Sequence, residues 1–150
     1  MKPYEKLLRY WQDTASVRTV KMNQESVDRL EARYGIRLPD DFRDYLLHAC
    51  PRDESENMDD EGTAWWPLDR LLNIPDEYPH TITDPAIAKN AAKYVFFADY
   101  MIWCWAWAID CSEDDKDRGR VAVIGGPDRF VADSFAEFVD RYIEDQTQIW

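Results

Sequence analysis

The feature that most constrains this chain is a series of β-prone segments in its second half. Two aromatic runs, Tyr94 to Ala98 and Met101 to Ile109, are separated only by Asp99-Tyr100 and indicate neighbouring strands. A third strand is expected at Val121 to Ile124, before a Gly-Gly-Pro-Asp turn, and a brief fourth at Phe130 to Ala132. Short turns between strands favour antiparallel pairing.

Helical patterns flank these strands. An apolar stripe from Tyr4 to Trp11 predicts a first helix, Asn23 and Gly35 mark the start and stop of a second, and Leu38-Pro39-Asp40-Asp41 begins a third. Ser134 and Glu137 form a capping box for the last helix.

Two further segments have weaker patterns. Thr63 to Ile74 is expected to be a short strand followed by a helical turn, and Ile82 to Lys93 a helix that begins near Pro85. We therefore expect one α+β domain over residues 1–150, a largely antiparallel twisted sheet flanked by helices.

The charge of the chain limits its partners. Thirty acidic residues against 18 basic ones give a formal net charge of −12. This charge repels nucleic-acid phosphates and anionic lipid surfaces and attracts basic proteins, so we expect no nucleic-acid or membrane partner. The alternative is that the acidic surface only keeps the protein in solution.

The cysteines and the N-terminus indicate a cytoplasmic protein. Cys50, Cys104 and Cys111 are odd in number and suggest no disulfide framework, which fits a reducing compartment. The chain has neither the apolar run of a signal peptide nor a stretch that could span a membrane.

No sequence pattern indicates catalysis or a cofactor. His48 and His80 are too few for a zinc site, and the acidic runs lack the ligand spacing of a calcium loop. The role of Ser134 as a helix cap explains this serine without a catalytic function. Gly125-Gly126 precedes a proline and resembles no phosphate-binding loop. We expect no enzyme, no metal and no cofactor.

Two groups of tryptophans have open alternatives. Trp103, Trp105 and Trp107 alternate, so in a strand they share one face, either as core or as an exposed platform. Trp65 and Trp66 point to opposite sides of a strand; one could be an exposed binding anchor, or both could be buried.

Three segments together resemble the SUKH superfamily, and most closely its branch named for a fungal regulator of cell-wall synthesis. They are Tyr34-Gly35 followed by Leu38-Pro39-Asp40-Asp41-Phe42, the strand ending Trp107-Ala108-Ile109-Asp110, and Ala132 to Phe138. The resemblance covers roughly Asn23 to Asp145 and makes residues 1–22 an N-terminal helical extension. One departure is that His48-Ala49-Cys50-Pro51 leads into an acidic loop where the family often has an Asn-Gly-Gly-like turn.

The resemblance implies a non-enzymatic binding protein, because bacterial members of the superfamily are similar to immunity proteins that neutralise toxins, many of them nucleases. A basic toxin domain is then the expected partner. The alternatives are a regulatory scaffold module and, least favoured, a carboxylate-based hydrolase. The expected contact residues are Asp53, Glu54, Glu56, Asp59, Asp60, Glu61, Trp65, Trp66, Asp114 and Asp115.

Overall fold

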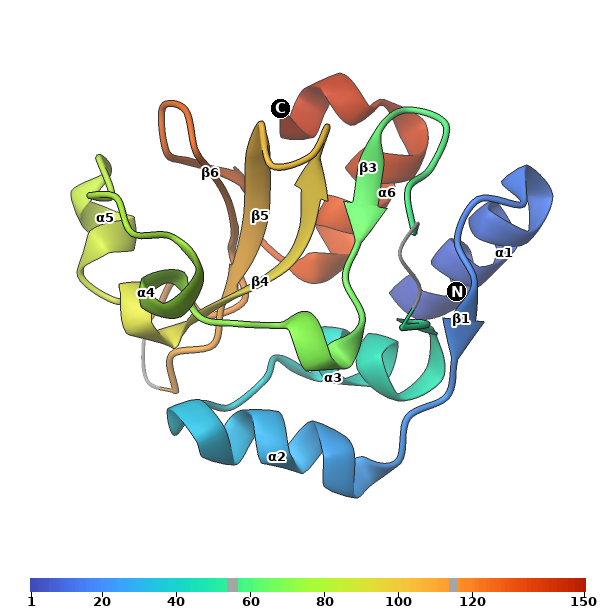
Figure 1. Ribbon diagram of the computed structural model, residues 1–150, viewed down its shortest axis with the longest axis horizontal. Coiled ribbons are helices and arrows are strands. Elements are labelled where there is room, and N and C mark those ends of the chain that lie inside the picture. Colours follow the sequence, from blue (N-terminus) through green and yellow to red (C-terminus); the bar gives the residue numbers. More distant parts are fainter. Residues whose placement is uncertain (54–56, 114–115) are drawn as a thin grey trace.

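A single antiparallel sheet organises the chain. The computed structural model describes residues 1–53, 57–113 and 116–150. Within them, five strands pair in the order β3-β4-β5-β6-β7, and helices pack around them, which confirms the α+β class (Figure 1). The strands are β3 (Thr63–Trp65), β4 (Tyr94–Tyr100), β5 (Trp105–Asp110), β6 (Val121–Ile124) and β7 (Arg129–Ala132).

The longer helices begin and end at their sequence signals. Asn23 Oδ1 accepts a hydrogen bond from the Ser26 backbone N–H at 2.8 Å, and Gly35, with a φ of 59°, ends that helix. Ser134 Oγ accepts from the Glu137 N–H at 3.0 Å. The α-helices are α1 (Pro3–Thr14), α2 (Gln24–Tyr34), α3 (Asp40–His48), α4 (Ile74–Glu77), α5 (Pro85–Ala88) and α6 (Phe135–Glu144), and the 3₁₀ turns are η1 (Leu68–Arg70), η2 (Ala91–Lys93) and η3 (Gln146–Ile149).

Two local expectations need correction. The single helix expected over Ile82 to Lys93 is wrong, because Asn90 leaves the helical conformation and separates α5 from η2. A small sheet of β1 (Thr19–Val20) and β2 (Cys50–Pro51) was not predicted. Its strands are two residues long, too short to show an alternating pattern.

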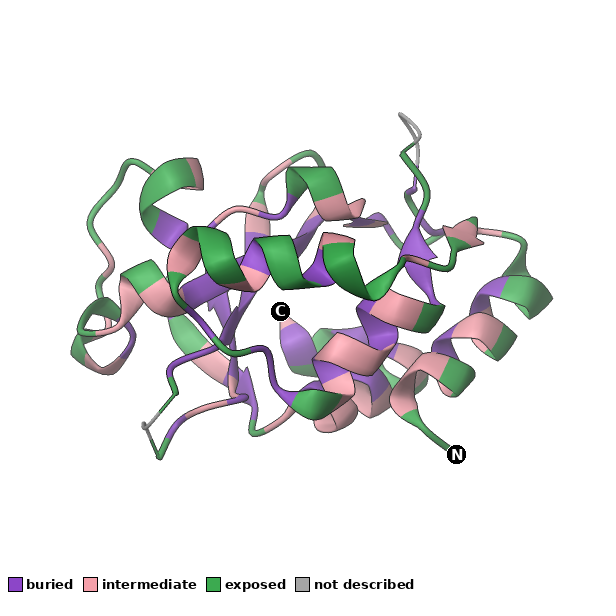
Figure 2. Cartoon of the chain, turned by 90° about the horizontal axis from the view of Figure 1, so that it is seen from below, coloured by how far each residue is buried: buried purple, intermediate pink, exposed green. Residues whose placement is uncertain are grey.

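The main core lies between one face of the sheet and the helices α1, α3 and α6. Trp65 is 1% exposed, and its rings contact those of Tyr45 and Phe97 at centroid distances of 5.8 Å and 5.7 Å. Trp107 is also fully buried and donates its indole N–H to the Ile149 carbonyl at 2.7 Å. Buried residues gather between helices and sheet, whereas the outward faces of the helices are exposed (Figure 2).

The N-terminal helix is fastened to the last one. Trp11 Nε1 donates to the Tyr142 hydroxyl at 3.2 Å, and Lys6 Nζ forms an ion pair with Asp140 at 2.6 Å. The first of these bonds is buried, so α1 completes the apolar side of α6.

A bulge in β4 decides which of its side chains point to the second face of the sheet. The register of β4 against β5 shifts between Phe96 and Ala98, so Phe97 packs on Phe138 of α6 while Phe96 contacts Trp66. Phe96 pairs with Ala108, and Asp99 pairs with Ala106 two residues earlier in β5. Ala106 and Ala108 are two residues apart in β5, so they and their partners Asp99 and Phe96 lie on the same face of the sheet, which is the face away from α6.

The connection between β4 and β5 differs from the prediction. A strand was expected from Met101 onward, but residues 101–104 form a turn in which Met101, Ile102 and Trp103 have φ values of 47°, 54° and 63°. The three tryptophans therefore do not share one face. Trp103 contacts Phe96 on the second face of the sheet, whereas Trp107 lies in the core with Phe138.

Candidate functional site

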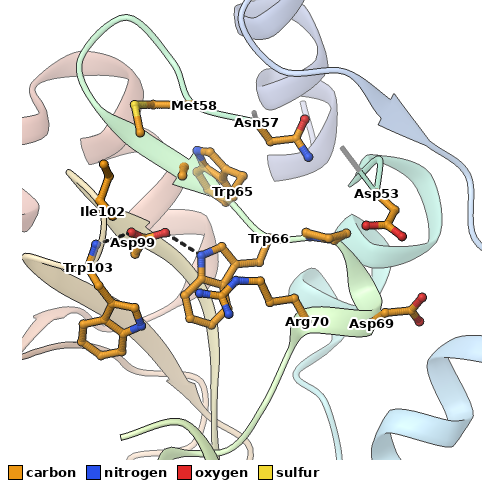
Figure 3. A pocket seen from close by; sticks show the side chains of 12 residues that line it. Asp53, Asn57, Met58, Trp65, Trp66, Asp69, Arg70, Asp99, Ile102 and Trp103 are labelled. Atoms are coloured by element: carbon orange, nitrogen blue, oxygen red, sulfur yellow. Dashed lines mark hydrogen bonds between the residues drawn. The ribbon is translucent and has the colours of Figure 1, made fainter. Parts of the chain in front are cut away.

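A hollow of about 550 Å³ lies beside the edge strand β3, and Trp66, Asp99 and Trp103 are among the residues that line it (Figure 3). A volume of this size is within the range of ligand pockets. It is formed by β3, η1, the turn after β4 and the end of the acidic loop. Its lining residues are Asp53, Asn57, Met58, Ala64, Trp65, Trp66, Pro67, Asp69, Arg70, Asp99, Ile102 and Trp103.

A buried carboxylate organises the floor of the hollow. Asp99 is 6% exposed; its Oδ1 accepts from the indole N–H of Trp66 at 2.7 Å and its Oδ2 from the backbone N–H of Trp103 at 2.6 Å. Hydrogen bonds to a charged acceptor are stronger than neutral ones. Asp99 therefore fixes the plane of the Trp66 ring and also holds the turn that follows β4 (Figure 3).

A cation covers the outer face of Trp66. The guanidinium carbon of Arg70 lies 3.7 Å from the centroid of the Trp66 ring, a cation–π contact (Figure 3). Arg70 Nη1 also pairs with Glu77 Oε1 at 3.0 Å, and the same oxygen accepts from the Trp103 indole N–H at 3.2 Å. The hollow thus already contains one guanidinium group, supplied by the chain itself.

An exposed apolar tip stands at the mouth of the hollow. We use "the tip" for residues 101–104. Ile102 is 87% exposed and Met101 50% exposed, and the nearby Met58 is 38% exposed. The Met101 N–H donates to the Gly62 carbonyl at 2.9 Å, which joins the tip to the end of the acidic loop. Left-handed backbone at non-glycine residues is strained, and such strain concentrates at functional sites.

The structure separates the predicted contact residues into groups. Asp53, Asp60 and Glu61 are exposed, as a contact surface requires. Trp65 and Trp66 are 1% and 2% exposed, which confirms the alternative that both are buried and excludes an exposed anchor at either. The predicted residues Glu54, Glu56, Asp114 and Asp115 lie outside the described residues.

Asp59 is the predicted loop residue whose expected role changes most. It is 6% exposed, and its Oδ1 accepts from the backbone N–H groups of Glu61 and Thr63 at 2.9 Å and 3.0 Å. Its Oδ2 accepts from the Tyr142 hydroxyl and from Gln146 Nε2. Burial, and then the Asp59 charge, raise the pKa of Tyr142. Asp59 ties the acidic loop to α6 and is not available to a partner.

The sequence does not single out Met101, Ile102 or Asp99 as site residues, and it places Trp103 in a strand. Met101, Ile102 and Trp103 continue an aromatic, β-prone pattern, and no glycine or asparagine marks the left-handed backbone. The sequence pattern predicts a short connection at Asp99-Tyr100, whereas the structure includes both residues in β4. The polar Asp99, which interrupts the apolar run between Tyr94 and Ile109, is the one feature of the sequence that could have indicated this site residue.

A further carboxylate, Asp41, has structural partners. Burial raises the pKa of Asp41, whose two oxygens accept from the backbone N–H groups of Phe42 and Ala136 at 2.8 Å and 3.0 Å. The second of these bonds joins the start of α3 to the start of α6. Among the described residues, no group of three or more His, Cys, Asp or Glu side chains has the arrangement of a metal site.

A family model matches most of the chain. The SMI1 / KNR4 family (SUKH-1) matches residues 21–141, which include every strand of the five-stranded sheet and α2 to α5. Helix α1 lies before the matched range. No curated protein matches the chain. None of the described helices has both the length and the apolar composition needed to cross a lipid bilayer.

Proposed function

Because the chain belongs to the SMI1 / KNR4 family (SUKH-1), we propose that it is a non-enzymatic, cytosolic binding protein of the immunity type. Its partner in this proposal is a basic toxin domain, with a nuclease as the favoured kind. Binding blocks the toxin by covering the cationic surface that would otherwise hold its substrate's phosphates.

The observation that carries the proposal is the exposed apolar tip beside exposed carboxylates. Isolated exposed apolar residues are common on proteins, but Met101 and Ile102 are adjacent, and the tip is joined to the acidic loop through Gly62. Asp60 and Glu61 are exposed on that loop. An apolar centre with a charged rim is the usual composition of a protein interface.

Charge supports the same partner class. The net charge of −12 accelerates the encounter with a basic protein, and the effect weakens as salt screens the charges. A toxin that acts on nucleic acid needs a cationic groove, so an acidic protein is complementary to it.

The contacts of the carboxylates favour binding over hydrolysis. Two of the buried acids, Asp59 and Asp99, have both oxygens bonded to N–H or O–H groups of the chain itself, and a third, Asp110, is 0% exposed. Asp41, whose pKa is raised, is also fully engaged. A general acid or base needs an oxygen that can reach the substrate.

The test is co-expression with the toxin domain encoded by the neighbouring gene. We expect protection of the cells, co-purification of a complex, and an association rate that falls as salt rises. Ile102→Asp should reduce the affinity at least tenfold, whereas the matched control Val20→Asp, at a 42% exposed residue on β1, should leave it unchanged. Failure to protect, or binding of several unrelated proteins with similar affinity, would support the regulatory scaffold instead.

A further inference from the structure

We infer that the hollow beside β3 is a binding site for a guanidinium group, the arginine side chain of a protein partner, and that Arg70 occupies the site until that side chain arrives. Only the source of the arginine rests on the proposed function. The site itself follows from the contacts of the described residues.

The position of Arg70 shows that the hollow accommodates a guanidinium. Its carbon lies 3.7 Å from the Trp66 ring centroid. The ring cannot turn away, because its N–H is bonded to Asp99 at 2.7 Å. Trp is the best of the aromatic side chains for a cation–π contact, and a fixed ring needs no reorganisation to make one. Trp66 therefore presents a permanent flat surface to a planar cation.

The hollow contains more negative charge than Arg70 balances. Its lining includes three carboxylates, Asp53, Asp69 and Asp99, against the one guanidinium of Arg70, a net charge of −2. Arg70 pairs with Glu77, which lies outside this lining, at 3.0 Å. The described ion pairs join none of the three lining carboxylates to a cation. A second cation would therefore enter a favourable field.

The remaining walls fit an arginine better than a small cation. Met58, Pro67 and Ile102 provide apolar contacts for the three-carbon stem, and Met58 and Ile102 are exposed at the mouth. Asn57 is 5% exposed, and its Oδ1 has no hydrogen-bond partner among the described residues. A guanidinium has five N–H donors in a plane, whereas an ammonium group has no flat face to stack on Trp66.

The exchange requires little from the fold. The Arg70 side chain is 42% exposed and lies on a three-residue 3₁₀ turn, so it can leave the Trp66 ring and stay paired with Glu77 at the edge of the hollow. The arriving guanidinium then stacks on Trp66 in the field of the carboxylates that line the hollow. Arg70 competes for its own site, so its removal should strengthen binding.

The experiment uses the full chain and three small probes. N-acetyl-arginine amide, its neutral citrulline counterpart and N-acetyl-lysine amide are titrated while NMR follows the indole N–H resonance of Trp66, assigned with Trp66→Phe. We expect a saturable shift with the arginine probe only. Arg70→Ala should tighten that binding about two- to fivefold, the equivalent of one exposed cation–π contact. Asp69→Asn should weaken it.

The matched control is Arg29→Ala, at an exposed arginine on α2 that pairs with Glu25 and does not line the hollow. Arg70→Gln, which keeps the length of the side chain, serves if Arg70→Ala unfolds. The inference is overturned if no probe shifts the resonance in either protein, if citrulline or lysine binds as well as arginine, or if loss of Arg70 fails to tighten binding. Toxin protection is measured separately. Arginine binding without protection would therefore refute the proposed function, while the inference of a guanidinium site would stand.

Discussion

Replacing Ile102 by asparagine should stabilise the free protein while it weakens partner binding. Ile102 has a φ of 54° and is 87% exposed. A β-branched residue is among the least suited to left-handed backbone, whereas asparagine is several-fold enriched there. The change therefore relieves the backbone and removes the most exposed apolar group of the tip.

The size of the effect follows from these two values. Left-handed backbone costs a non-glycine residue about 1–2 kcal/mol, and asparagine should recover roughly 1 kcal/mol of it. Burial of Ile102 offsets little of this gain, because only a small part of the side chain is covered. For a domain of this size, about 1 kcal/mol raises the Tm by roughly 2–4 °C.

The assay is thermal unfolding of the isolated chain beside toxin binding by the same variant. Val20→Asn is the control, because Val20 is an exposed apolar residue in ordinary strand backbone, and it should show no gain in Tm. A lower Tm for Ile102→Asn would show that the isoleucine side chain holds the tip. An unchanged affinity for the toxin would show that the tip is not a contact.

Three further predictions concern the fold. Tyr45→Phe removes a buried hydroxyl without a described partner and should stabilise by about 1 kcal/mol at neutral pH in urea unfolding. Burial raises the pKa of Tyr45, so this tyrosine ionises first in the unfolded chain and the free energy of unfolding falls above about pH 10. Tyr45→Phe should reduce the slope of the unfolding free energy against pH by about 1.4 kcal/mol per pH unit. An unchanged slope would contradict the raised pKa of Tyr45. Asp59→Ala leaves Tyr142 and two backbone N–H groups unpaired and should cost at least about 3 kcal/mol; a loss below about 1 kcal/mol would place Asp59 in solvent. Ser134→Ala should cost about 1 kcal/mol of unfolding free energy, and no loss would mean that the cap contributes nothing.

Features that depend on neighbours along the chain were predictable. The caps at Asn23 and Ser134 and the stop at Gly35 join groups three or four residues apart, so a short window contains the whole interaction. The strands β6 and β7 follow from apolar runs bounded by a turn. The family was also predictable, because its motifs lie at those same caps and strands.

The roles of the acidic residues and of the tip were decided by tertiary contacts. Asp59 and Asp60 are adjacent in the sequence, yet one is buried because Tyr142, 83 residues away, donates to it, while the other faces solvent. Asp99 belongs to the hollow because its partner Trp66 lies 33 residues earlier. The net charge, the caps of α2 and α6 and the strands β6 and β7 are local properties that the sequence by itself determined. Which carboxylates are buried and which apolar residues are exposed depends on distant segments meeting, and only the folded structure decided it.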